Sequence, residues 1–182
     1  MSSTITKATI EELYQEKGKA EIVDGEIVKF MPTGAMPSRA GSLIYVSLLL
    51  HERTVGGGHA FADNTGFVVT LPNRDSFSPD AAWYVGNIQS MKFLEGAPVF
   101  AVEVRSENDY GAKAEREIAN KRRDYFAAGT LVVWDVDLLS EEVIKVYRPD
   151  APDTPTIYKR GEVAEAEPAV PGWKMPVDEL FR

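Results

Sequence analysis

The chain has 182 residues, a net charge of −8 and no cysteine. Because single cores usually hold about 100–200 residues, this length predicts one domain over residues 1–182. The lack of cysteine excludes disulfides, thiolate metal sites and cysteine nucleophiles. The acidic balance excludes a general nucleic-acid coating protein, because phosphates would repel it, but it allows a local basic patch. With no targeting segment and no apolar run near the roughly 20 residues that span a bilayer, we expect a cytoplasmic protein.

The N-terminal third carries clear local signals. Thr9 and Glu12 have the spacing of a capping box and predict a short helix. Asp24-Gly25, between two β-branched runs, predicts a hairpin within residues 21–30. A longer helix is predicted over residues 38–53, ended by the glycines that follow. The residues expected on its buried face are Leu43, Val46, Leu49 and Leu50.

The rest of the chain alternates strands with one strong helix. Strands are predicted over residues 59–63, 67–71, 80–84, 99–105, 131–136 and 142–148. Residues 111–128 form the helix, and Gly129 suits the position just past its end. A strand, this helix and another strand in succession predict a parallel crossover unit. The proline-rich segment 149–155 is predicted to be a loop, and the fold class is α/β with a mixed, partly antiparallel sheet.

Glu103 stands out within an otherwise apolar strand. An ionised carboxylate there is costly unless it is paired or binds a metal. Residues two apart on a strand share a face, so Glu103 and Arg105 are expected to point the same way. The simplest interpretation is a partly buried ion pair with a strand neighbour or with the adjacent helix.

Asp80 opens a second interpretation. It follows Pro79 at the start of an apolar strand, where aspartate is also common as a turn residue. Two carboxylates on neighbouring strand ends, Asp80 and Glu103, could instead hold a hard divalent cation such as magnesium. Such an ion activates water and neutralises charge on a phosphate, which is the chemistry of phosphodiester hydrolysis.

The ordered motifs resemble a known family. Pro79-Asp80 and the Glu103 strand look like the PD-(D/E)xK nuclease signature, and the chain is similar almost end to end to the Uma-two family of restriction-endonuclease-like proteins. The segments that carry the resemblance are Glu21–Glu26, Ser78–Asp80, Val102–Ser106, Lys121–Tyr125, Gly129, Val133–Asp137 and Val170–Trp173. The resemblance implies a restriction-endonuclease-like core, a mixed central sheet flanked by helices, with an N-terminal hairpin.

The resemblance also implies roles for individual residues. Asp80 and Glu103 would bind Mg²⁺, which Mn²⁺ could replace, and Glu21 would complete the acidic cluster. The lysine expected two residues after the glutamate is replaced by Arg105, and in this family it appears on the following helix, here as Lys121. Lys121 would support the attacking water and the phosphate. On spacing alone, a salt bridge from Lys121 to Glu117 is the alternative.

The predicted substrate is DNA, bound weakly. Residues 105–123 carry six basic and four acidic side chains, so this segment holds +2 while the rest of the chain holds −10. Arg105 and Arg122 are the predicted phosphate contacts within it, although ordinary charge pairing on a solvated helix would explain the same composition. No membrane partner is expected, and a homodimer would suit cutting both strands.

Two other functions stay open. The family often carries a histidine before the first long helix, where this chain has Ser38-Arg39. That departure and the acidic surface also fit a catalytically inactive module with a nuclease fold that binds or assembles with partners. An enzyme acting on RNA or short single strands is the third hypothesis, since it would not need a broad face for duplex DNA.

Overall fold

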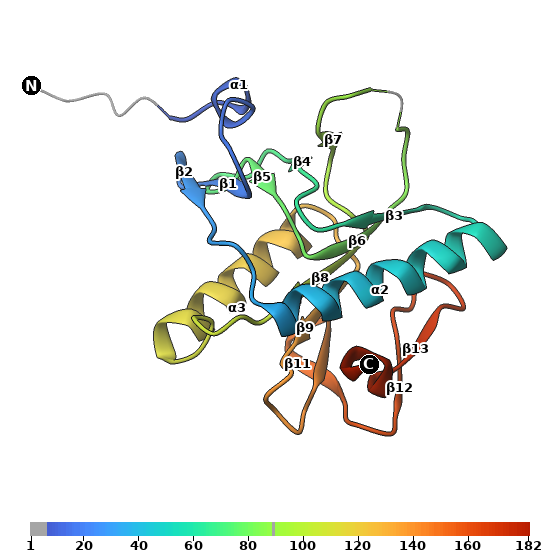
Figure 1. The fold of residues 1–182 in the computed structure, drawn as a ribbon. Helices are drawn as coiled ribbons and strands as arrows, with labels where there is room; N and C mark the ends of the chain where they lie inside the picture. Colours follow the sequence, from blue (N-terminus) through green and yellow to red (C-terminus); the bar gives the residue numbers. More distant parts are fainter. Residues whose placement is uncertain (1–6, 89) are drawn as a thin grey trace, which may run out of the picture.

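A mixed six-stranded sheet lies at the centre of the protein, in the order β11-β10-β9-β8-β6-β3 (Figure 1). The computed structural model describes residues 7–88 and 90–182. The strands of this sheet are β3 (His59–Ala62), β6 (Ala81–Tyr84), β8 (Phe100–Val104), β9 (Val132–Val136), β10 (Ile144–Arg148) and β11 (Ala151–Tyr158). Strands β8 and β9 are parallel and the other neighbours are antiparallel, which confirms the predicted crossover.

One long helix covers each face of the sheet. Helix α2 (Ala35–Thr54) packs on β3, β6 and β8, and α3 (Ala112–Ala127) lies on the opposite face (Figure 1). Residues alternate along β6, so Trp83 enters the core under α2 while Tyr84 enters the core under α3. The sheet is therefore buried on both sides, as expected for strands that are apolar throughout. No helix in the described part of the chain is long and apolar enough to cross a membrane.

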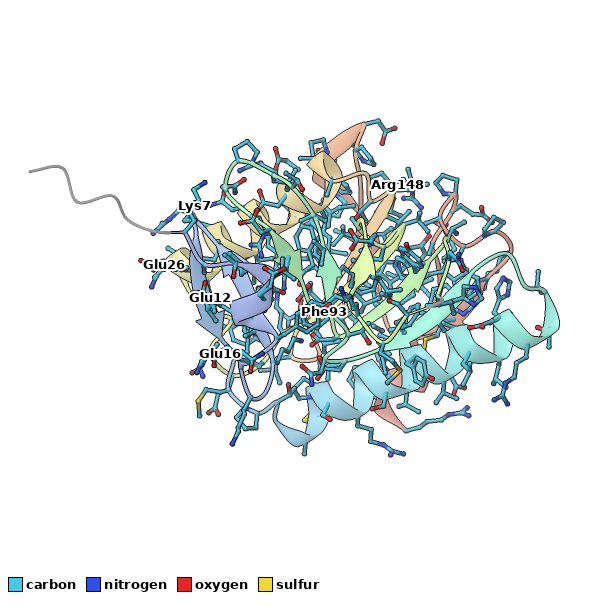
Figure 2. All side chains as sticks on the ribbon, turned by 90° about the horizontal axis from the view of Figure 1, so that it is seen from above. Lys7, Glu12, Glu16, Glu26, Phe93 and Arg148 are labelled. Atoms are coloured by element: carbon cyan, nitrogen blue, oxygen red, sulfur yellow. The ribbon has the colours of Figure 1, made fainter. Side chains whose placement is uncertain are left out.

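The N-terminal segment forms the predicted helix and hairpin. Helix α1 (Ile10–Leu13) starts at a capping box between Thr9 and Glu12, and the hairpin pairs β1 (Ala20–Val23) with β2 (Glu26–Lys29). Figure 2 shows Lys7, Glu12, Glu16 and Glu26 together at the end of the molecule formed by this segment. The hairpin matters for function because its first strand carries Glu21.

The turn of this hairpin depends on glycine. Gly25 has a φ of +79° and Asp24 a φ of +52°, the left-handed conformations that the tightest hairpin turns require. We expect Gly25→Ala to lower the free energy of unfolding by about 1 kcal/mol, because a Cβ is disfavoured at this φ. Urea denaturation measures this change, and an unaltered free energy would show that the turn tolerates a side chain.

The remaining elements form two smaller sheets. A three-stranded sheet contains β4 (Phe67–Val68), β5 (Ser76–Phe77) and β7 (Leu94–Glu95). A C-terminal pair consists of β12 (Val163–Glu165) and β13 (Lys174–Pro176), followed by the 3-10 helix η1 (Val177–Phe181). Met175 and Leu180 from these C-terminal elements enter the core beneath α2.

The predicted buried face of α2 is wrong in part, because only Leu43 of the four predicted residues packs against the core. The buried residues of this helix are Ala40, Gly41, Ile44 and Leu48, whereas Val46 and Leu50 are about half exposed. The spacing of the leucines and valines alone predicts a different buried face, formed by Leu43, Val46, Leu49 and Leu50. The small residues decide the outcome, because Ala40 and Gly41 let the helix backbone come close to the sheet.

The predicted proline-rich loop is also wrong in part. Residues 151–158 form β11, the outermost strand, which pairs with β10 on one side only. Pro152 and Pro155 are compatible with this strand because an edge strand leaves one row of amide groups outside the ladder.

Candidate active site

Four of the predicted site residues come together. Lys121 of α3 places its Nζ atom 2.9 Å from Glu21 Oε1 and 2.8 Å from Glu103 Oε1. Glu21 comes from β1 and Glu103 from β8, so the lysine joins the hairpin, the sheet and the crossover helix. Asp80, directly before β6, lies close enough to Glu103 to influence its pKa. Lys121 does not pair with Glu117, which lies near Lys113 instead.

Glu21 is completely enclosed, and both of its oxygens are occupied. Oε1 also accepts a hydrogen bond from the Ser78 amide at 2.8 Å, and Oε2 accepts one from Arg74 at 2.6 Å. Burial alone would raise the pKa of Glu21, but Lys121 and Arg74 outweigh it, and the pKa is lowered. Glu21 is therefore an ionised anchor that holds Lys121 in place.

Glu103 has a different environment. Tyr125 donates its hydroxyl to Glu103 Oε1 at 2.6 Å, and no hydrogen bond to Oε2 is found among the described residues. Burial raises the pKa of Glu103, and the nearby Asp80 and Glu21 add to this effect against Lys121. One carboxylate oxygen is thus fixed by the helix while the other is left for a further partner.

Asp80 is held by a lysine that the sequence analysis missed. Its Oδ2 accepts the Val104 amide at 2.7 Å, and its Oδ1 lies 2.6 Å from Lys19 Nζ. Lys19 also contacts Asp63 Oδ1 at 2.7 Å. Burial opposes the charged lysine, but Asp80, Glu103 and Asp63 outweigh it and raise the pKa of Lys19. The available signal was its position two residues before Glu21, which places both side chains on one face of the chain entering β1.

Residues of two neighbouring segments pack against the two lysines and Asp80. Phe30, just after β2, lies over both ammonium groups, with its ring centre 5.9 Å from Lys19 Nζ and 5.6 Å from Lys121 Nζ. On the other side, a Cβ at Gly41 of α2 would stand 3.5 Å from the Asp80 carbonyl oxygen. Helix α2 therefore packs closely against the backbone at Asp80.

Arg105 and Arg122, which were predicted to contact phosphate, bind other groups of the protein instead. Arg105 points to the α3 side of the sheet, as Glu103 does, but it binds Asp135 at 2.7 and 2.8 Å and also pairs with Glu115. Arg122 donates to the Pro152 carbonyl and stacks on Tyr147, with 3.7 Å between guanidinium and ring centre. Both side chains are more than nine-tenths buried. This placement favours a structural role for each.

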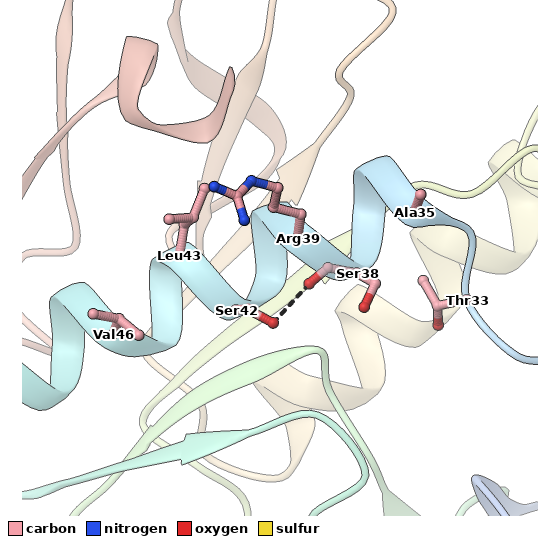
Figure 3. Close-up of a pocket in the computed structure, with 7 residues that line it drawn as sticks. All are labelled: Thr33, Ala35, Ser38, Arg39, Ser42, Leu43 and Val46. Atoms are coloured by element: carbon pink, nitrogen blue, oxygen red, sulfur yellow. Dashed lines mark hydrogen bonds between the residues drawn. The ribbon is translucent and has the colours of Figure 1, made fainter. Parts of the chain in front are cut away.

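Ser38 and Arg39, which stand where the resemblance leads one to expect a histidine, face away from the sheet. Ser38 and Arg39 are exposed on α2 and line an open surface hollow with Thr33, Ala35, Ser42, Leu43 and Val46 (Figure 3). Ser42 donates to the Ser38 carbonyl, and Arg39 donates to the Arg182 carbonyl. These contacts tie α2 to itself and to the C-terminus, not to the carboxylates.

The oxygen donors suit a hard cation, although they are not gathered as a ready cage. Among residues 7–88 and 90–182, no group of three or more acidic or histidine side chains is arranged to hold a metal. Mg²⁺ is usually bound through only one or two carboxylates and keeps several waters. Asp80 and Glu103 offer two such carboxylates, since Glu103 Oε2 accepts no hydrogen bond among the described residues and the Lys19 partner of Asp80 is shared with Asp63. Glu21 differs because it is 1% exposed and is held by Arg74, Lys121 and the Ser78 amide.

The fold is similar to that of a solved structure described as a putative nuclease. A crystal structure of a putative nuclease belonging to DUF820 from Anabaena variabilis ATCC 29413 superposes with a TM-score of 0.75, at 15% identity, over 96% of this chain and 97% of that chain. The model of the Uma2 family, described as "Putative restriction endonuclease", matches residues 8–178. The chain therefore belongs to the Uma2 family. No curated protein matches it.

Proposed function

We propose that this protein is a metal-dependent endonuclease that hydrolyses DNA phosphodiester bonds. The observation that carries the proposal is the Lys121 ammonium, 2.8 Å from the carboxylate of Glu103, whose pKa Asp80 also influences, within a fold similar to that of a putative nuclease. An amine and two carboxylates from separate elements meet at one point, which a purely structural ion pair would not require.

Asp80 and Glu103 would hold Mg²⁺, with Mn²⁺ as a substitute. The bound ion would make a water molecule more nucleophilic and neutralise charge on the phosphate. Tyr125 fixes the orientation of Glu103, and the Val104 amide fixes Asp80, so the two carboxylates are held before any ligand arrives. Glu21 serves as the anchor of Lys121.

Lys121 would act on the substrate itself. Its ammonium keeps its proton, because Glu103 and Glu21 outweigh the effect of burial and raise its pKa. A permanently charged donor suits stabilisation of the negative charge that develops on the phosphate, and it can orient the attacking water by a hydrogen bond. It is poorly suited to removing a proton from that water.

The charge of the molecule supports weak binding to DNA. The net charge is −8, and the exposed basic side chains of α3 are few: Lys113, Arg116 and Arg123. Affinity for a polyanion therefore depends on this small surface, and we expect it to fall steeply with added salt.

Cleavage of supercoiled plasmid tests the proposed function. We expect cleavage with Mg²⁺ or Mn²⁺, none with EDTA, and a loss of about a hundredfold or more in Asp80→Asn. Asp178→Asn is the matched control, because this aspartate of η1 pairs with Arg160 outside the carboxylate cluster. Equal rates for Asp80→Asn and the wild type would contradict the proposal, as would cleavage in EDTA.

A catalytically inactive binding or assembly module is the second candidate. The observation that favours it is that each carboxylate of the cluster already has a cationic partner: Lys121 and Arg74 for Glu21, Lys121 for Glu103, and Lys19 for Asp80. Such a module would show neither cleavage nor a thermal shift with magnesium.

Comparison of single-stranded, duplex and RNA substrates in the same cleavage assay tests the third hypothesis, an enzyme that acts on RNA or short single strands.

A further inference from the structure

The geometry points to Lys19 as an internal competitor of the divalent cation: it occupies Asp80 and must leave that oxygen when the ion binds. This inference rests on the proposed function, because it assigns the ion to Asp80. It adds a residue that sets the affinity of the site for metal, a role separate from that of Lys121.

The first step is that both Asp80 oxygens already carry a hydrogen bond, and the one on Oδ1 comes from a cation. Oδ2 accepts the Val104 amide at 2.7 Å, a bond from the backbone at the end of β8. Oδ1 lies 2.6 Å from Lys19 Nζ. Two cations sharing one carboxylate oxygen would repel each other strongly at such distances. Binding of a divalent ion at Oδ1 therefore requires that the ammonium withdraws.

The second step is that Lys19 has somewhere to remain. Asp63, at the end of β3, holds the same ammonium at 2.7 Å, and its side chain is 45% exposed against 13% for Asp80. Lys19 can therefore give up Asp80 without becoming an unpaired buried charge. The exposed partner lies toward solvent, and a small rotation of the lysine side chain about this contact would open Oδ1.

The third step is the balance of charge. Lys19 neutralises Asp80 and lies in the field of Glu103. Without the lysine, these two carboxylates would repel each other and attract any cation more strongly. The same ammonium therefore stabilises the metal-free protein and weakens the binding of metal.

Titration calorimetry with Mn²⁺ tests the inference on Lys19→Met, which keeps the length of the side chain. We expect the variant to bind Mn²⁺ about tenfold more tightly than the wild type, because the competing charge is gone. The matched control is Lys29→Met, which removes the same charge from a lysine that is 61% exposed and pairs with Glu16 at the N-terminal end of the molecule. Asp80→Asn, which should lose binding, identifies the site.

The outcomes separate the two proposals. Binding that depends on Asp80 but is equal or weaker in Lys19→Met would overturn the competition and leave the metal site intact. Absence of Asp80-dependent binding in both the wild type and Lys19→Met would overturn the metal site, and the competition with it. If both Lys19→Met and Lys29→Met bind Mn²⁺ more tightly than the wild type, the change in net charge explains the effect, and the specific role of Lys19 is overturned.

A measurement on the wild type covers the case in which Lys19→Met fails to fold. Acetylation by a limiting amount of an amine-reactive reagent, mapped by mass spectrometry, reports the accessibility of each lysine. Lys19 is 15% exposed and should become severalfold more reactive when Mg²⁺ is added, while Lys29, at 61%, stays unchanged. Unaltered reactivity of Lys19 under saturating Mg²⁺ would contradict its displacement.

Discussion

Replacement of Lys121 by methionine is expected to reduce plasmid cleavage about a hundredfold or more, since one donor that stabilises developing charge has an effect of this size. Its ammonium contacts both Glu103 and Glu21 and is 16% exposed, so it lies at the carboxylates yet stays within reach of a phosphate. The rate of nicking at saturating Mg²⁺, with the enzyme in excess, measures the chemical step.

Lys113→Met is the matched control for this variant. Lys113 lies on the same helix, is 84% exposed and pairs with Glu117, so its loss should leave the rate per bound complex unchanged. Circular dichroism must show that Lys121→Met is folded, since Glu21 loses a partner. A folded Lys121→Met protein with the wild-type rate would remove this lysine from the reaction.

Glu21→Gln is expected to lower the free energy of unfolding by about 3 kcal/mol at neutral pH, the usual cost of removing one partner of a buried ion pair. The carboxylate compensates two cations at once, Arg74 at 2.6 Å and Lys121 at 2.9 Å, and it is 1% exposed. Glutamine can still accept hydrogen bonds, but it leaves the positive charges without their counter-charge. Urea denaturation at pH 7 measures the difference.

The pH dependence of this variant gives an independent check. Because the pKa of Glu21 is lowered from 4.5 by Lys121 and Arg74 despite its burial, its charge stabilises the fold above pH 4.5. That stabilisation is lost as the pH falls through the lower value of the folded state. Glu21→Gln should therefore lose less stability than the wild type on acidification below pH 4.5. Glu117→Gln, at an exposed pair, should follow the wild type.

Much of the architecture could be predicted because its signals are local. Thr9 and Glu12 formed the expected cap, and Asp24-Gly25 formed the expected hairpin turn, since both depend on neighbouring backbone groups. The crossover through α3 followed from apolar runs on either side of a helical pattern, which fit only a buried parallel pair. The convergence of Lys121 with two glutamates was expected from family motifs rather than from spacing.

The partners of charged groups could not be predicted in this way. Lys19 meets Asp63 and Asp80, which are 44 and 61 residues away in the chain. Any of the 28 acidic side chains could have been its partner, and no periodicity selects one. The same holds for Arg105, whose position two residues after Glu103 suggested a phosphate contact, while the fold brings Asp135 of the parallel neighbour β9 against it.

The sequence by itself determined the turn at Asp24-Gly25, the helices α1, α2 and α3, the main strands of the central sheet, and that Glu103 lies in an apolar strand. Only the tertiary structure decided that Glu21 anchors a lysine, that Asp80 is held by Lys19, and that α2 approaches the sheet through Ala40 and Gly41. The reason is physical. Backbone hydrogen bonds and the alternation of apolar residues act between near neighbours, whereas an ion pair depends on distances that exist only after distant segments have packed together.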